Sequence, residues 1–148
     1  MIGIAILLAV VVVAVLIGVV VRRRDGAVRA AGGTGPDAGR RRALIAAGAA
    51  EGSVTVLHFS AEWCGPCSAV RRVVAAAVDI LTGEGHRVLD VEVDMEADPA
   101  LARDFRVMSL PTTVVLDGDL RERFRASGVP SSADLRAAVT AASRPDAG

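Results

Sequence analysis

Two cysteines, the only ones among the 148 residues, lie in the run WCGPC at residues 63–67. The run directly follows an apolar stretch, residues 54–59, whose composition predicts a strand. Two thiols separated by two residues at a strand-to-helix junction can close into a small disulfide ring and reopen. The N-terminus of a helix favours the thiolate over the thiol, because peptide dipoles leave a partial positive charge there. These residues therefore predict dithiol–disulfide exchange.

The two cysteines are expected to have different roles. A free cysteine has a pKa of about 8.5, and a helix N-terminus lowers it to roughly 3.5–7.5. Cys64, expected to be exposed at the helix start, is therefore the candidate nucleophile. Cys67 comes about one turn later, shielded but within reach of Cys64, and is the candidate for resolving a mixed disulfide. Gly65 is expected to permit this close approach, and Pro66 suits a first helical turn because no backbone donor is needed there.

A metal site is an alternative use of such a cysteine pair. Zinc sites normally need four ligands, and the only further candidates are His58 and His86. Because there is no second cysteine pair, we expect no metal. A structural pair of buried cysteines is the remaining alternative.

The segment at residues 61–67, Ala-Glu-Trp-Cys-Gly-Pro-Cys, resembles the signature of the thioredoxin family. The segment at residues 107–113, Val-Met-Ser-Leu-Pro-Thr-Thr, resembles the second landmark of that family, and Gly128 matches the glycine after its last strand. The likeness runs from about residue 54 to residue 142. It implies an α/β protein with a thioredoxin-like three-layer α/β/α sandwich and a mixed central sheet. It also implies a redox-active Cys64–Cys67 disulfide and no other cofactor.

The same resemblance implies roles for residues around the dithiol. Pro111 would follow a cis peptide bond and face the dithiol, whereas a trans proline would simply interrupt a strand entrance. The Leu110 backbone would pair with an extended substrate segment in a strand-like way, with Thr112 and Gly128 beside it. Trp63 would flank the substrate surface, unless its role is ordinary packing.

His58 departs from the family pattern. It lies six residues before Cys64, where many thioredoxins carry a buried aspartate that shuttles a proton for the second cysteine. An imidazole can do similar work, since its unperturbed pKa is about 6.5. The alternative, which we favour, is a neutral histidine that is hydrogen-bonded inside the sheet.

The first twenty-one residues carry a separate signal. Residues 2–21 are uncharged and almost entirely aliphatic, and a helix of that length spans roughly 30 Å, the thickness of the hydrocarbon core of a bilayer. Three arginines follow at residues 22–24, which is typical of a stop-transfer sequence rather than of a cleaved signal peptide. We therefore expect residues 1–21 to form a transmembrane helix with the lipid bilayer as partner.

Charge predicts the orientation of this anchor. Residues 22–42 carry a net charge of +5 and residues 43–148 one of −5, so the overall zero hides a strong asymmetry. A basic segment after the apolar run favours a single-pass protein with its folded domain in the cytoplasm. An extracytoplasmic domain, as in anchored relatives that reduce apocytochrome or secreted proteins, stays the alternative. The acidic folded part gives no indication of nucleic acid binding.

The rest of the chain reads as a basic flexible linker, residues 22–42, and a thioredoxin-like domain, residues 43–148. Within them the patterns predict a short strand within residues 26–30, a helix at residues 40–47 and a helix from residue 67 to about residue 83. They also predict strands at 87–94, 113–116 and 120–126, a helix from residue 99, and a last helix at 131–142.

Taken together, the residues predict a membrane-tethered protein-disulfide reductase. Its partners would be disulfide-containing protein substrates and an electron donor, for which a thioredoxin reductase is one candidate. The competing function is a binding module at the membrane that keeps the fold without redox turnover.

Overall fold

The computed structural model describes residues 2–144, except for the side chains of residues 2, 3, 5 and 22–24. A five-stranded mixed sheet forms the centre of the domain, with strand order β1-β5-β4-β2-β3. Only β2 and β3 are parallel, and the other neighbouring pairs are antiparallel. The strands are β1 Arg29–Ala30, β2 Val54–Ser60, β3 Val88–Asp94, β4 Thr112–Leu116 and β5 Glu122–Ser127.

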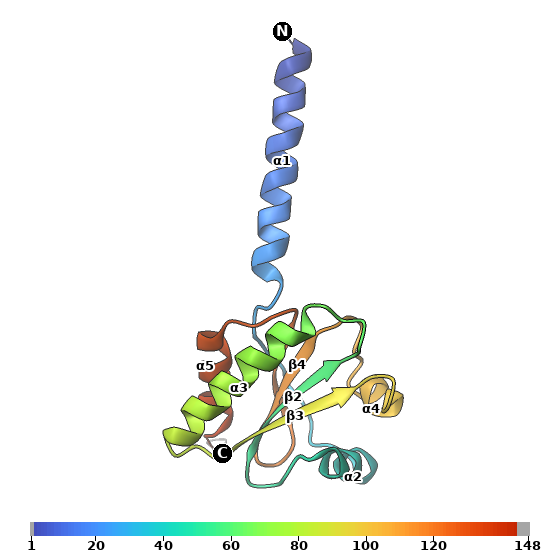
Figure 1. The fold of residues 1–148 in the computed structure, drawn as a ribbon, viewed down its shortest axis with the longest axis vertical. Helices are drawn as coiled ribbons and strands as arrows, with labels where there is room; N and C mark the ends of the chain where they lie inside the picture. Colours follow the sequence, from blue (N-terminus) through green and yellow to red (C-terminus); the bar gives the residue numbers. More distant parts are fainter. Residues whose placement is uncertain (1, 145–148) are drawn as a thin grey trace.

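Helices cover both faces of this sheet, as Figure 1 shows. Helices α3 (Cys67–Gly83) and α5 (Ser132–Ala142) pack against one face, and α2 (Ala38–Ala47) and α4 (Pro99–Asp104) against the other. Each face therefore has its own apolar cluster, and the expected three-layer α/β/α sandwich with a mixed sheet is confirmed. Alternate residues of β2 enter the two clusters, as the period of a strand requires.

Apolar periodicity and capping account for most of the helices. In α3 the buried positions are spaced along one side of the helix, at Val70, Val74, Ala77 and Leu81. The α4 helix begins after Asp98, whose side chain accepts a hydrogen bond from the Leu101 N–H, and it carries Pro99 in its first turn. These helices were predicted from the same features.

The turn between β4 and β5 is longer than the sequence predicted. The Asp117 carboxylate accepts hydrogen bonds from the Asp119 and Arg121 N–H groups, and Leu120 has a φ of 61°. These bonds hold the backbone in the turn through Arg121. The fifth strand therefore begins at Glu122 rather than at Leu120.

Part of the segment expected as a linker belongs to the fold. Strand β1 lies within the short strand predicted for residues 26–30 and pairs with β5, with Arg29 opposite Arg125 and Ala30 opposite Phe124. Helix α2 begins at Ala38, two residues before the predicted start, because the Asp37 side chain caps it by accepting a hydrogen bond from the Arg40 N–H.

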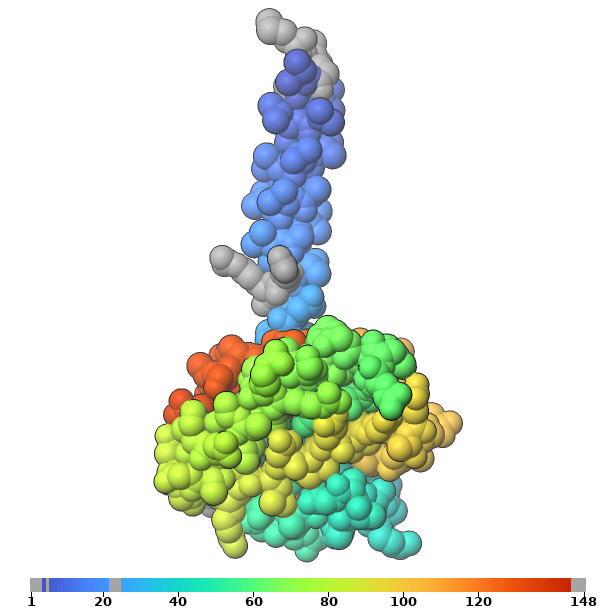
Figure 2. Space-filling view, viewed as in Figure 1, coloured from blue at the N-terminus to red at the C-terminus, as the bar shows by residue number. Residues whose placement is uncertain are grey.

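Helix α1 (Ile2–Arg24) precedes the domain and stands clear of it in Figures 1 and 2. Its described apolar side chains are exposed, with fractions between 44% and 67% for the large ones. Among the residues described, however, no helix is long and apolar enough to cross a membrane.

Candidate dithiol site

The two cysteines form a disulfide between the end of β2 and the start of α3, with 5.5 Å between their Cα atoms. The backbone turns tightly here: the Cys64 N–H donates to the Ala61 carbonyl, and the Cys67 N–H donates to the Cys64 carbonyl. The sequence predicted this position from the apolar strand before the pair and the amphipathic helix after it.

Burial distinguishes the two cysteines. Cys64 is 9% exposed and Cys67 only 1%, so Cys64 is the sulfur that a substrate can approach more readily. The greater exposure of Cys64 agrees with its role as nucleophile, and the burial of Cys67 agrees with its role as the resolving cysteine. The expectation that Cys64 is openly exposed at the helix start is wrong, because α3 begins at Cys67 and Cys64 lies in the turn before it.

The two residues between the cysteines have different effects. Pro66 is the N-cap of α3 with a helical φ of −66°, so it leads the chain into the helix without needing a backbone donor. Gly65 is exposed, and a Cβ there would meet no atom within 4 Å other than those of its chain neighbours. That Gly65 permits the close approach of the cysteines stays a prediction. Its missing side chain leaves the surface beside Cys64 open.

The loop that precedes β4 packs against the dithiol. The Leu110–Pro111 peptide bond is cis, as predicted, and Leu110 packs against the cluster of Ala61, Cys64 and Cys67. Thr112 is buried and its hydroxyl donates to the Ser109 carbonyl.

Gly128 joins this group from the end of β5. Its N–H donates to the Pro111 carbonyl at 2.8 Å, and its φ is 87°, which favours glycine. The structure thus brings Leu110, Pro111 and Gly128 together at the end of the sheet that carries the dithiol.

Two large apolar side chains in the segments next to the dithiol are exposed. Trp63 is 71% exposed, and its indole N–H donates to the Glu96 carboxylate at 3.0 Å. Met108, in the loop before Pro111, is 92% exposed. The sequence did not single out Met108, because nothing in its neighbours distinguishes an exposed methionine from a packed one.

His58 is buried on the face of the sheet that α3 covers. It alternates with Val54 and Val56, which belong to the apolar cluster on that face. Its Nε2 atom lies 3.0 Å from Oδ1 of Asp90 on β3. The imidazole is therefore hydrogen-bonded inside the fold, as the favoured alternative predicted. Asp90 was not predicted as its partner, since only the register of β2 and β3 places the two side chains together.

A charged network on the same face links α3 to the ends of β2 and β3. The Arg71 guanidinium donates to both carboxylate oxygens of Glu92, and the Ser60 hydroxyl donates to Oε1 of Glu92. Hydrogen bonds from Arg71 lower the pKa of Glu92 to about 2; partial burial opposes this, and Ser60 and His58 add to it. Arg71 lies one turn after Cys67, so the network holds the first turns of α3 against the sheet.

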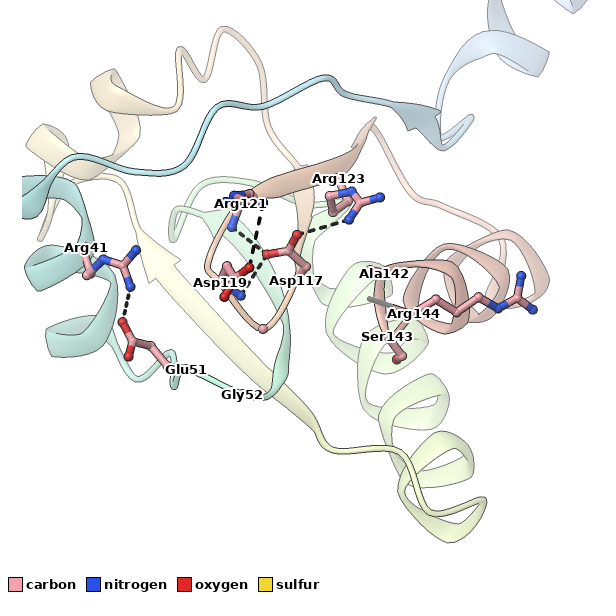
Figure 3. Close-up of a pocket in the computed structure, with 11 residues that line it drawn as sticks. Arg41, Glu51, Gly52, Asp117, Asp119, Arg121, Arg123, Ala142, Ser143 and Arg144 are labelled. Atoms are coloured by element: carbon pink, nitrogen blue, oxygen red, sulfur yellow. Dashed lines mark hydrogen bonds and ion pairs between the residues drawn. The ribbon is translucent and has the colours of Figure 1, made fainter. Parts of the chain in front are cut away.

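A cleft of about 590 Å³ lies elsewhere, lined by residues including Arg41, Glu51, Asp117 and Arg123 (Figure 3). It is at the opposite end of the sheet from the dithiol, because Leu116 pairs with Thr55 at the start of β2. Arg41 pairs with Glu51 and Arg123 with Asp117, so opposite charges in the cleft neutralise each other. The cleft contains none of the residues predicted for the site.

Fold and site together define a class of protein. A mixed sheet between two helical layers, a disulfide where a strand meets a helix, and a cis-proline loop packed against it are the parts of a thiol–disulfide oxidoreductase. The thioredoxin sequence profile matches residues 45–141, and the chain belongs to the thioredoxin family. Members of this family use a redox-active cysteine pair and need no further cofactor.

Relatives agree with this assignment. The thioredoxin of Mycolicibacterium smegmatis is 40% identical over 60 residues, which cover 40% of this chain and 53% of that protein. This chain thus matches about half the length of that relative. The thioredoxin of Streptomyces clavuligerus is 33% identical over 81 residues, covering 55% of this chain and 72% of that protein.

Solved structures show the same fold. Chloroplastic thioredoxin z superimposes with a TM-score of 0.56 at 25% identity, covering 72% of this chain and 90% of that chain. Thioredoxin-2 of the malaria parasite gives 0.50 at 30% identity, covering 60% of this chain and 82% of that chain.

Proposed function

We propose that this chain is a membrane-tethered thiol–disulfide oxidoreductase that reduces protein disulfides. The observation that carries the proposal is the unequal burial of a bonded cysteine pair at the sheet end. Cys64 is the more accessible sulfur and Cys67 is almost fully covered. That arrangement suits an attacking and a resolving thiol.

The exchange proceeds in two displacements. In the reduced protein the Cys64 thiolate attacks one sulfur of the substrate disulfide, and the other sulfur leaves as a thiolate that takes up a proton. Cys67 then loses its proton and attacks the Cys64 sulfur of the mixed disulfide. The Cys64–Cys67 bond forms, the second substrate thiol is released, and two electrons have passed to the substrate.

The loop around Pro111 positions the substrate in this proposal. The Leu110 backbone pairs with an extended substrate segment, Thr112 and Gly128 shape the loop, and Trp63 contacts the substrate from the other side. The support is their common location beside the dithiol and the exposure of Trp63.

An electron donor must return the disulfide to the dithiol. A relative from Mycobacterium leprae is named a bifunctional thioredoxin reductase/thioredoxin and is 34% identical over 64 residues, which are 13% of that protein. By analogy, we propose a thioredoxin reductase as the donor for this chain.

Residues 2–21 insert into a lipid bilayer in this proposal, and the basic collar at residues 22–24 stays on the cytoplasmic side. The support is the sequence: twenty uncharged residues followed by three arginines. The alternative orientation makes the protein an extracytoplasmic reductant for cytochrome or secreted-protein maturation. Labelling with a membrane-impermeant maleimide in intact cells, after reduction, separates the two, since labelling excludes the cytoplasmic placement.

Insulin reduction by the full chain in detergent tests the chemistry. Cys64→Ser abolishes turnover, because the attacking sulfur is gone, whereas Cys67→Ser accumulates mixed disulfides. Retained turnover in Cys64→Ser refutes the proposed roles. A redox titration tests the competing binding module: a reversible two-electron couple supports the reductase, and cysteines that do not cycle support the module.

A further inference from the structure

The register of β1 determines where the N-terminal helix joins the domain. Strand β1 runs antiparallel to β5, with Arg29 opposite Arg125 and Ala30 opposite Phe124. Residues before Arg29 therefore continue toward the last residue of β5, Ser127. Ser127 pairs with Thr112, which in turn pairs with Phe59 at the end of β2. The chain thus enters the domain at the end of the sheet that carries the dithiol, as Figure 1 shows for α1 and the turn from β2 to α3.

The junction between α1 and the domain is short and docked. The Asp25 N–H donates to the Val21 carbonyl at 3.0 Å and closes the last turn of α1. The next residue, Gly26, already donates to the Ser127 carbonyl. Gly26 has a φ of 83°, and a Cβ there would overlap the carbonyl oxygen of Val129. One residue, Asp25, is thus the whole linker between the end of α1 and the first docked residue.

The surface on which Gly26 docks is continuous with the dithiol site. A Cβ on Gly128 would lie 3.0 Å from the Gly26 nitrogen. The Gly128 N–H donates to the Pro111 carbonyl, and Leu110 packs against the cysteines. Only a few backbone contacts therefore separate the end of the anchor helix from the reacting sulfurs.

We infer that the dithiol surface is held against the bilayer, and that its substrates are disulfides of proteins located at the membrane surface. The inference rests on the proposed insertion of α1. A one-residue linker reaches at most about 3.5 Å, whereas a flexible linker over residues 22–42 would span roughly 25 Å and let the domain turn. A disulfide presented close to the lipid meets Cys64 at a high effective concentration. A large soluble protein finds the same surface obstructed by the bilayer.

Size-dependent labelling of Cys64 tests this placement in full-length protein. In the Cys67→Ser variant Cys64 is the only thiol, and its labelling by a 5-kDa polyethylene-glycol maleimide is compared with labelling by a small impermeant maleimide. The rate of labelling by the large maleimide is divided by the rate of labelling by the small one, and this ratio is measured in phosphatidylcholine–phosphatidylglycerol vesicles and in detergent. We expect the ratio to be at least tenfold lower in vesicles. Insertion of a 20-residue Gly-Ser spacer between Arg24 and Asp25 should restore the detergent value.

Two glycine substitutions, each combined with Cys67→Ser, give a matched pair. Gly26→Ala removes the docking by overlap with Val129 and should raise the ratio in vesicles as the spacer does. Gly32→Ala introduces a Cβ with no atom within 4 Å and should leave the ratio unchanged. Insulin turnover of the single glycine variants, with both cysteines intact, is measured in detergent to establish that the site itself is preserved.

The outcomes separate this inference from the proposed function. If the protein is extracted from vesicles by alkaline carbonate, α1 does not insert, and the proposed membrane tether and the placement of the dithiol at the bilayer both fail, whatever the insulin turnover. If insulin turnover in detergent is absent, the reductase proposal and the inferred substrates fail, whereas the placement of Cys64 is still decided by the labelling ratio. If the protein is inserted and active but the ratio is equal in vesicles and detergent, with and without the spacer, only the placement of the dithiol at the bilayer is overturned.

Discussion

Nε2 of His58 lies 3.0 Å from Oδ1 of Asp90, joining a buried imidazole on β2 to a half-buried carboxylate on β3. The two side chains occupy the face of the sheet that α3 covers, and α3 begins with Cys67. A carboxylate at this distance fixes the orientation of the ring. Asp90 is thus a candidate positioning residue that acts through His58.

The first prediction concerns the effect of Asp90 on the dithiol. Asp90→Asn replaces the carboxylate that holds the His58 ring at 3.0 Å. If His58 takes part in exchange, the less firmly oriented ring should slow Cys64–Cys67 disulfide exchange by about two- to tenfold, the effect of one weakened hydrogen bond. The rate of Cys64–Cys67 disulfide reduction measures it.

Histidine substitutions provide the control for this prediction. His58→Ala should slow exchange at least as much, and the double variant with Asp90→Asn should match His58→Ala alone, because Asp90 acts only through the ring. His86→Ala, which changes the other histidine of the chain, should leave the rate as it is. An unchanged rate in His58→Ala excludes His58 from the mechanism.

Two buried threonines allow a test of the surroundings of His58. Thr113 lies opposite His58 on β4, and its hydroxyl has no hydrogen-bond partner among the described residues; the same holds for Thr55 near the other end of β2. Replacing an unpaired buried hydroxyl by a methyl group is neutral or stabilising, by up to about 1 kcal/mol. Urea unfolding should therefore show no loss of stability in Thr113→Val or Thr55→Val.

Their effects on the rate of exchange should differ. Thr113→Val replaces a polar neighbour of His58 and should alter the rate of Cys64–Cys67 exchange, whereas Thr55→Val, which lies on the opposite face of the sheet, should not. Equal rates in the two variants contradict a polar contribution of Thr113 to the site.

The low pKa of Glu92 predicts that the free energy of unfolding decreases in acid. Its pKa is about 2 in the folded protein because Arg71 donates hydrogen bonds to it, against an ordinary value of 4.5. The unfolded chain therefore binds the proton first as the pH falls. The stabilising contribution is complete above about pH 4.5 and is lost progressively as the pH falls toward 2.

Glu92→Gln measures this contribution. The difference in the free energy of unfolding between wild type and variant should be greatest near neutral pH and should shrink between pH 4.5 and pH 2. Asp79→Asn serves as a control, since Asp79 lies on α3 and makes no such pair among the described contacts. A difference that stays constant with pH means that the Arg71–Glu92 pair does not couple proton binding to folding.

The sequence predicts this fold well where a pattern is local. The helical spacing of Val70, Val74 and Leu81 indicated both the extent of α3 and its buried side, and the position of the disulfide followed from the strand before it. The cis bond before Pro111 was predicted from a family resemblance rather than from local physics.

The features that the sequence did not reveal depend on contacts between distant segments. The pairing of Asp90 with His58 requires the register of β2 and β3, and the low exposure of Cys64 requires the loop at Leu110 to pack against it. A short strand was predicted within residues 26–30, but its partner was not. The docking of Gly26 on Ser127 uses only backbone groups, so side-chain patterns cannot identify the segment with which it pairs.

The last prediction concerns Trp63, an apolar side chain that is 71% exposed beside the dithiol. Because it is so exposed, Trp63→Ala should change the free energy of unfolding by less than about 0.5 kcal/mol. If the ring contacts substrate, its loss should raise the KM for insulin about tenfold, which corresponds to about 1.4 kcal/mol of binding. Ile80→Ala is the matched control, since Ile80 is a 43% exposed apolar residue of α3 more than three turns from Cys67. Steady-state kinetics of both variants check the prediction: a raised KM in Trp63→Ala alone supports a substrate contact. Equal KM values in both variants leave Trp63 with the packing role only.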